Sequence, residues 1–415
     1  MKTTNRATTD LQRDYGKLIN AAHIKWLKSV GLDIVEAKRD GAYVTDLDGK
    51  RYLDCYSNAG TFNRGRLQAD VVAELRTAMR ETDQGNFPMI SREKARLAGA
   101  LAEFVGGELE CTVYSVMRGE SFDFACKLAR GFTGRPKLVA VDGSWFGETG
   151  FALSLSTRDD KNDFAPLVPQ TQIIPFGDVD AARAAIDDQT ACLLLEPLQT
   201  ENGCREASPE YLRTLRQICN AAGALLALDE TQTGLGRTGV KFAYQRTDVA
   251  PDMLLVGEAL GAGVFPIAAT IFTQRINAFM NAHPLIHLST FGGSDLGCRV
   301  GAKALAVYAE RKPWENAARL GGRLQEELSA LTGGVLQAVH GRGLLWSLTF
   351  KTPAQAVRAN KLLAANGVLA VPGAVAKDTV VLRPSLLLTD RDVDALVRAV
   401  KKTLTEMKPK ARAKK

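Results

Sequence analysis

Seven short apolar runs, separated by stretches of helical periodicity, constrain the fold of this chain more than any other feature. They cover residues 112–117, 137–141, 172–175, 192–196, 224–229, 253–257 and 268–272. Continuous apolar runs of this length are typical of strands buried on both faces, as in a parallel sheet covered by helices. The pattern therefore predicts an α/β fold built on one large, mainly parallel sheet.

The two ends of the chain follow a different pattern. Residues 41–54 alternate apolar and polar side chains around Asp48-Gly49, which predicts an early hairpin. After residue 296 come two long helical stretches, three further strands and a closing helix, for which Asp390 is the expected N-cap. Both ends are expected to form one smaller α+β domain. The predicted boundaries are 1–60 and 296–407 for the smaller domain, 61–295 for the large α/β domain and 408–415 for a basic tail.

Composition excludes several classes of protein. The chain has 415 residues, of which 46% are hydrophobic and 24% charged, so disordered, collagen-like and fibrous classes are excluded. No apolar stretch approaches the roughly 18 residues that span a bilayer. Residues 1–10 also lack the apolar segment of a secretory signal. We therefore expect no membrane partner and a cytoplasmic protein.

The net charge of +7 is concentrated at the C-terminus. Residues 401–415 hold seven basic residues and one acid, which is +6, so about +1 remains for the rest of the chain. Such a run is typical of a solvated tail, and we expect no nucleic-acid partner. The seven cysteines are odd in number and form no C-x-x-C pair, and the four histidines are scattered. Neither a disulfide framework nor a metal site is expected.

A candidate ligand site follows the run that ends at Asp229. Residues 230–239 after it contain three glycines, one arginine and one glutamine. Open α/β sheets bind ligands at the carboxyl ends of their strands. A carboxylate at a strand end is often only a helix cap or a loop residue, but the glycine-rich loop makes a ligand site the more specific interpretation.

At this point the chain resembles the class III aminotransferases. These are a pyridoxal-phosphate (PLP) family of fold type I that also contains glutamate-semialdehyde aminomutase and the ornithine and GABA aminotransferases. The resemblance implies a large, mainly parallel α/β domain beside a smaller α+β domain formed by both termini. It is carried by residues 44–54, 127–137, 196–197, 229–239, 251–252, 259–263, 289–293, 341–343 and 381–385.

The resemblance assigns three residues to the cofactor ring. Asp229 would face the pyridinium nitrogen and keep the ring protonated, and Gln232 would lie beside the ring hydroxyl. Trp145 falls where the family carries an aromatic residue that stacks on the ring, although simple core packing is the alternative for this side chain.

Further residues are assigned to the phosphate and the substrate. Gly119, at the start of a helix expected over 121–132, would offer backbone N–H groups to the phosphate. Thr290 and Gly292 would complete this phosphate cup from the partner subunit, which implies a homodimer. Arg383 matches the family arginine that binds a substrate carboxylate, and a strand-end surface arginine is the alternative.

The sequence departs from the family at three positions. Glu258 stands where the Schiff-base lysine belongs, and no lysine lies between Lys241 and Lys303. The resemblance therefore implies an active site without the lysine that forms the internal aldimine. Glu120 lies in the expected phosphate cup, where a carboxylate about 4 Å from a phosphate would repel it by about 4 kcal/mol at an effective dielectric near 20. Phe146 replaces a usual histidine.

Three hypotheses remain open. In the first, an atypical enzyme binds PLP or pyridoxamine phosphate (PMP) non-covalently and acts on a small amino or oxo acid, with Glu258 as general acid and base and Asp229 tuning the ring. In the second, the cleft binds no cofactor and acts on an amine-bearing metabolite through Glu258 and Glu120 as paired carboxylates. In the third, the protein is an inactive pseudoenzyme or a regulatory dimer.

Overall fold

A seven-stranded sheet forms the centre of the computed structural model, which describes residues 6–408. Its strand order is β4-β12-β11-β10-β7-β5-β6, and β12 runs antiparallel to both of its neighbours, β11 and β4. The other neighbouring pairs are parallel. The strands are β4 (Leu109–Ser115), β5 (Lys137–Val141), β6 (Thr171–Ile174), β7 (Thr190–Leu195), β10 (Leu225–Asp229), β11 (Met253–Val256) and β12 (Ala268–Thr273). Each apolar run of the sequence is thus a strand of one mainly parallel sheet, as predicted.

The sheet is buried on both faces, which explains why its strands are apolar throughout. On β7, Cys192 and Leu194 pack into a cluster with Phe122 of α5, whereas Leu193 and Leu195 pack into the main cluster on the other face. Side chains alternate between the faces because the period of a strand is two residues. The α-helices between residues 69 and 311 are α3 (Ala69–Glu81), α4 (Arg92–Val105), α5 (Arg118–Thr133), α6 (Gly150–Leu155), α7 (Val179–Ala185), α8 (Pro209–Ala222), α9 (Gln274–Ala282) and α10 (Asp295–Arg311), and short 3-10 helices span Asp159–Phe164, Ala243–Arg246 and Glu258–Gly261.

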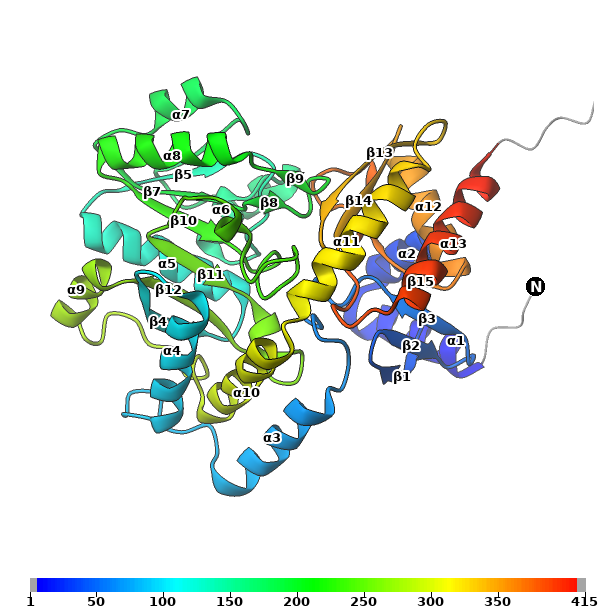
Figure 1. The fold of residues 1–415 in the computed structure, drawn as a ribbon, viewed down its shortest axis with the longest axis horizontal. Coiled ribbons are helices and arrows are strands. Elements are labelled where there is room, and N and C mark those ends of the chain that lie inside the picture. Colours follow the sequence, from blue (N-terminus) through cyan, green and yellow to red (C-terminus); the bar gives the residue numbers. More distant parts are fainter. Residues whose placement is uncertain (1–5, 409–415) are drawn as a thin grey trace, which may run out of the picture.

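Within residues 6–408, the first and last segments of the chain lie together beside this sheet (Figure 1). The predicted hairpin is present as β2 (Tyr43–Asp46) and β3 (Arg51–Asp54), and β3 pairs with β15 (Val368–Leu369) from the far end of the chain. The remaining strands are β1 (Glu36–Asp40), β8 (Leu198–Gln199), β9 (Arg205–Glu206), β13 (Leu336–Arg342), β14 (Leu345–Phe350), β16 (Val371–Pro372) and β17 (Thr379–Leu382). The remaining α-helices are α1 (Arg6–Tyr15), α2 (Ala21–Val30), α11 (Pro313–Ser329), α12 (Pro353–Ala365) and α13 (Asp390–Met407), and a π-helical turn over Gly16–Asn20 joins α1 to α2.

The closing helix corrects one detail of the sequence analysis. Helix α13 spans the expected residues, but its N-cap is Thr389 rather than Asp390. The side chain of Thr389 accepts a hydrogen bond from the backbone N–H of Asp392, and the Asp392 side chain returns to the backbone of Thr389. This reciprocal capping box satisfies two backbone donors. The domain boundaries stay a prediction, and most of the basic tail, residues 409–415, lies outside the described residues.

No helix among residues 6–408 is both long enough and apolar enough to cross a membrane. Over the same residues, no group of three or more His, Cys, Asp or Glu side chains is arranged to hold a metal ion.

Candidate functional site

Three carboxylates meet at one edge of the central sheet. Strands β11, β10 and β7 are parallel neighbours, so their carboxyl ends lie at the same edge. Glu258 follows β11, Asp229 ends β10 and Glu196 follows β7. The cluster therefore results directly from the strand order of the fold.

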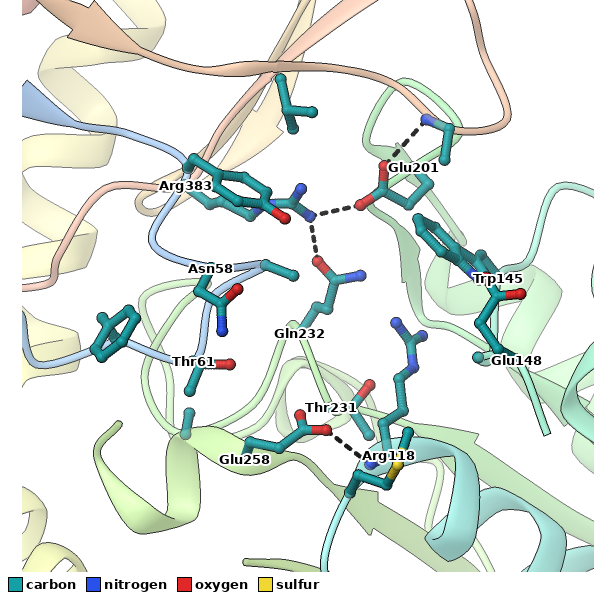
Figure 2. Close-up of a pocket in the computed structure, with 18 of the residues that line it drawn as sticks. Asn58, Thr61, Arg118, Trp145, Glu148, Glu201, Thr231, Gln232, Glu258 and Arg383 are labelled. Atoms are coloured by element: carbon teal, nitrogen blue, oxygen red, sulfur yellow. Dashed lines mark hydrogen bonds and ion pairs between the residues drawn. The ribbon is translucent and has the colours of Figure 1, made fainter. Parts of the chain in front are cut away.

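A single arginine joins two of these acids. Arg118 is the first residue of α5, and its side chain turns inward (Figure 2). Its Nη2 lies 2.9 Å from Oε1 of Glu196 and 3.1 Å from Oδ2 of Asp229. Burial opposes the positive charge of Arg118, but the two carboxylates outweigh burial and raise the pKa of the guanidinium. The sequence allowed an inward-facing Arg118 but did not assign it these partners, because nothing in its neighbours indicates the direction of the side chain at a helix start.

Asp229 is fully engaged by the protein itself. Its Oδ1 accepts hydrogen bonds from the backbone N–H of Thr231 at 2.9 Å and from the hydroxyl of Thr231 at 2.6 Å. Its Oδ2 is bound by Arg118, and the side chain is only 1% exposed. This arrangement differs from the expectation that Asp229 faces a ligand, because Thr231 and Arg118 together satisfy both of its oxygens.

Glu196 shares Arg118 with Asp229 and has a raised pKa. Burial raises the pKa of Glu196 to about 8; Arg118 opposes this rise and the negative charge of Asp229 adds to it. Because the folded protein holds this proton more tightly than the unfolded chain, the contribution of Glu196 to stability is full below its ordinary pKa of 4.5 and is lost as the pH rises through about 8.

We expect Glu196→Gln to remove this pH dependence, because glutamine cannot lose a proton. Relative to the unmodified protein, the melting temperature of the variant should rise steadily from about pH 5 to pH 8. Thermal unfolding followed by circular dichroism at three pH values within this window measures the difference. A constant difference across the window would contradict the raised pKa.

A cavity of about 920 Å³ lies above this edge of the sheet, between it and the segments from the chain ends. Five of the predicted site residues line it: Gly119, Trp145, Gln232, Glu258 and Arg383. Arg118 and Glu201 line it as well (Figure 2). The structure thus brings together five of the nine site residues that the sequence predicted.

Glu258 combines a contact to the protein with a free oxygen. Its Oε1 accepts a hydrogen bond from the backbone N–H of Arg118 at 2.8 Å. No residue among 6–408 donates a hydrogen bond to the other oxygen, Oε2. The carboxylate therefore faces the cavity with one oxygen held at the start of α5 and the other available to a ligand.

Arg383 is held by two side chains on the opposite side of the cavity. Its Nη1 lies 2.6 Å from Oε1 of Glu201 and also donates to the side-chain oxygen of Gln232. Burial raises the pKa of Glu201, but the Arg383 guanidinium outweighs burial and lowers it overall, so Glu201 is ionised at neutral pH. Glu201 was not among the predicted site residues, and its only signal in the sequence was a polar segment directly after the short strand β8.

Three predicted site residues lie elsewhere. Glu120 turns away from the cavity, because its Oε2 accepts a hydrogen bond from the backbone N–H of Val116 at 2.7 Å. The expected pair of Glu120 and Glu258 is therefore not formed across the cavity. Thr290 is exposed, and Gly292 lines a separate cavity beside Tyr114. Their contribution to a partner subunit, and with it the homodimer, stays a prediction.

Comparison with known proteins identifies the family. Residues 28–404 match the family model of class III aminotransferases. An uncharacterized aminotransferase of Archaeoglobus fulgidus is 40% identical over 79% of this chain and 78% of its own length. The chain belongs to the class III aminotransferase family.

Solved structures agree with this assignment. The ornithine aminotransferase of Toxoplasma gondii is similar with a TM-score of 0.89 and 27% identity, over 98% of this chain and 96% of that one. An amine transaminase from an uncultivated Pseudomonas species, in its PLP-bound internal aldimine form, shares the fold with a TM-score of 0.84 and 24% identity, over 90% and 95% of the two chains. The fold is thus that of the PLP-dependent fold type I enzymes.

The residues of this family member do not fit PLP or PMP as they stand. PLP carries an anionic phosphate and a ring nitrogen that a carboxylate keeps protonated. Here both oxygens of Asp229 are already bonded, and the N–H of Arg118 at the start of α5 donates to Glu258. The assignment of Glu258 to the position of the Schiff-base lysine stays a prediction from the resemblance. The geometry therefore does not support the expectation of a non-covalently bound cofactor.

Proposed function

We propose that this member of the class III aminotransferase family binds a small amino or oxo acid in the 920 Å³ cavity and moves a proton on it with Glu258, without an internal aldimine. One observation carries the proposal. Glu258 and Arg383 line the same cavity, and each retains an atom, Oε2 and Nη2 respectively, that no residue among 6–408 contacts by a hydrogen bond.

Opposite charges on two sides of one cavity suit a ligand with two polar ends. A guanidinium binds a carboxylate through charge-assisted hydrogen bonds, which supports an acid as the ligand of Arg383. Glu258 would then lie near the amine or the carbonyl group of the ligand. On an oxo acid, Oε2 of Glu258 would accept a proton from the carbon beside the carbonyl group. The C–H electron pair would form the double bond of an enolate, and the reverse step would return the proton.

Deuterium exchange tests this proposal on 2-oxoglutarate as the probe. In D2O, the protein should exchange the hydrogens on the carbon beside the carbonyl group faster than buffer alone, as followed by proton NMR. Glu258→Gln should slow the enzymatic exchange by about 10² or more, which is the usual contribution of a positioned acid or base. Calorimetric titration should show that its affinity for 2-oxoglutarate stays within about threefold.

Other results of the exchange experiment would favour a different mechanism or function. Unchanged exchange in Glu258→Gln would remove Glu258 from the mechanism. Binding without any exchange would favour an inactive or regulatory protein that senses a metabolite. Exchange that requires added PLP or PMP would favour the non-covalent cofactor enzyme, for which Arg118 would have to leave Asp229.

A further inference from the structure

The start of α5 holds an anion that the protein supplies itself. This helix spans 16 residues, and helix N-termini attract negative charge because their first N–H groups are unpaired. Here the N–H of Arg118, the first residue, donates to Oε1 of Glu258 at 2.8 Å. Gly119, the residue to which the family resemblance assigns the phosphate, comes next in the helix and lines the same cavity. A carboxylate thus binds the first N–H group at the end of α5 where the resemblance places the phosphate.

The buried carboxylate of Asp229 likewise holds a cation that the protein supplies. Both Nε and Nη2 of Arg118 approach Oδ2 of Asp229, at 3.4 Å and 3.1 Å. The guanidinium is planar and permanently charged, and a pyridine ring that a carboxylate keeps protonated is likewise a planar cation. The Arg118 guanidinium therefore binds Oδ2 of Asp229, the oxygen to which a ring nitrogen would donate its hydrogen bond.

One residue couples the two contacts. The backbone of Arg118 binds Glu258 while its side chain binds Asp229, so the anion and the cation are fixed relative to each other. We propose that Glu258 and Arg118 together substitute for the phosphate and the ring nitrogen of PLP, and that this internal substitute excludes PLP and PMP from the cleft. The inference goes beyond the proposed function, because it concerns exclusion of the cofactor and is independent of the ligand that binds in its place.

The substitute has two parts, so restoring the lysine alone should not restore cofactor binding. Glu258→Lys supplies the amine and frees the start of α5, but Arg118 still occupies Asp229. Removing Arg118 as well exposes Asp229, and Glu196→Gln then removes the second buried carboxylate that Arg118 had paired. The informative protein is therefore the triple variant Glu258→Lys, Arg118→Ser, Glu196→Gln.

A matched control replaces Arg213 in place of Arg118. Arg213 pairs with Glu210 and Asp248 at the surface, so Glu258→Lys, Arg213→Ser, Glu196→Gln has the same net charge and an intact Arg118. Full-length proteins are titrated with PLP and with PMP by visible absorbance, then treated with borohydride and weighed by intact mass spectrometry. We expect no saturable binding to the unmodified protein. The triple variant should bind PLP at least tenfold tighter than the control, and after reduction its intact mass should increase by that of one covalently attached PLP.

Two results would overturn the proposal: saturable binding of PLP or PMP to the unmodified protein, or equal PLP affinity of a folded triple variant and its control. If the triple variant does not fold, a second measurement tests the proposal. Glu258→Gln keeps the size of the side chain but removes the anion at the start of α5, so inorganic phosphate should bind this variant at least tenfold tighter than the unmodified protein. Equal phosphate affinity of the two proteins, in thermal shifts at matched ionic strength, would contradict the role of Glu258.

Discussion

Replacing Arg118 with methionine is expected to lower the free energy of unfolding by about 3–5 kcal/mol, the usual effect of removing one partner of a buried ion pair. The side chain of Arg118 is 13% exposed, and those of its partners Glu196 and Asp229 are 2% and 1% exposed. Methionine fills a similar volume, so the loss reports the unpaired carboxylate of Asp229 and the lost hydrogen bond of Glu196 rather than a cavity. Urea unfolding followed by circular dichroism measures the difference.

A surface arginine gives the matched comparison. Arg213 also contacts two acids, but its side chain is 44% exposed and those of Glu210 and Asp248 are 75% and 70% exposed. Exposed pairs contribute little, so Arg213→Met should change the free energy of unfolding by less than about 1 kcal/mol. Equal losses in the two variants would mean that the Arg118 cluster is as well solvated as the surface.

Neutralising the partners should restore most of the lost stability. In Arg118→Met combined with Glu196→Gln and Asp229→Asn, no buried charge is left without a counter-charge, and the amides keep their hydrogen-bonding groups. Recovery in this triple variant shows that the penalty is electrostatic. A triple variant that is no more stable than Arg118→Met would instead indicate that the aliphatic part of Arg118 determines the packing of α5.

The sheet and the residues at its edge could be predicted from the sequence because they depend on regular patterns. Apolar runs marked the buried strands, and strand ends marked Asp229. The resemblance to the class III aminotransferases, rather than periodicity, carried the prediction that Trp145, Gln232 and Arg383 converge, and all three line the cavity. Periodicity determines where a strand ends, and the strand order determines which ends meet.

The polar contacts inside the site could not be predicted, because they depend on the direction of individual side chains. Glu120 and Glu258 are both acids near the expected phosphate cup, yet Glu258 lines the cavity while Glu120 caps the backbone at Val116. Arg118 follows the exposed Met117 in the chain but pairs with acids that lie 78 and 111 residues further on. Such pairings depend on rotamers and burial rather than on spacing in the sequence.

Arg383 lies at the other side of the cavity. Because it is proposed to bind a ligand carboxylate, its removal should weaken ligand binding roughly 30-fold or more, which is about 2 kcal/mol. Arg383→Met alone would leave Glu201 buried without a partner. The informative variant is therefore Arg383→Met combined with Glu201→Gln, which removes both charges together. L-ornithine is a suitable probe, and putrescine, which has the same two amines and no carboxylate, is its control in calorimetric titration.

Glu201→Gln alone should have the opposite effect. Arg383 holds Glu201 ionised by lowering its pKa, so a ligand carboxylate must compete with a negative charge 2.6 Å from Nη1 of Arg383. An amide at this position still accepts a hydrogen bond but carries no charge, so ornithine should bind several-fold tighter and putrescine should not. Equal changes for the two probes would show that Glu201 and Arg383 act only on the shape of the cavity. A gain for ornithine alone, together with its loss in the double variant, assigns the carboxylate of the ligand to Arg383.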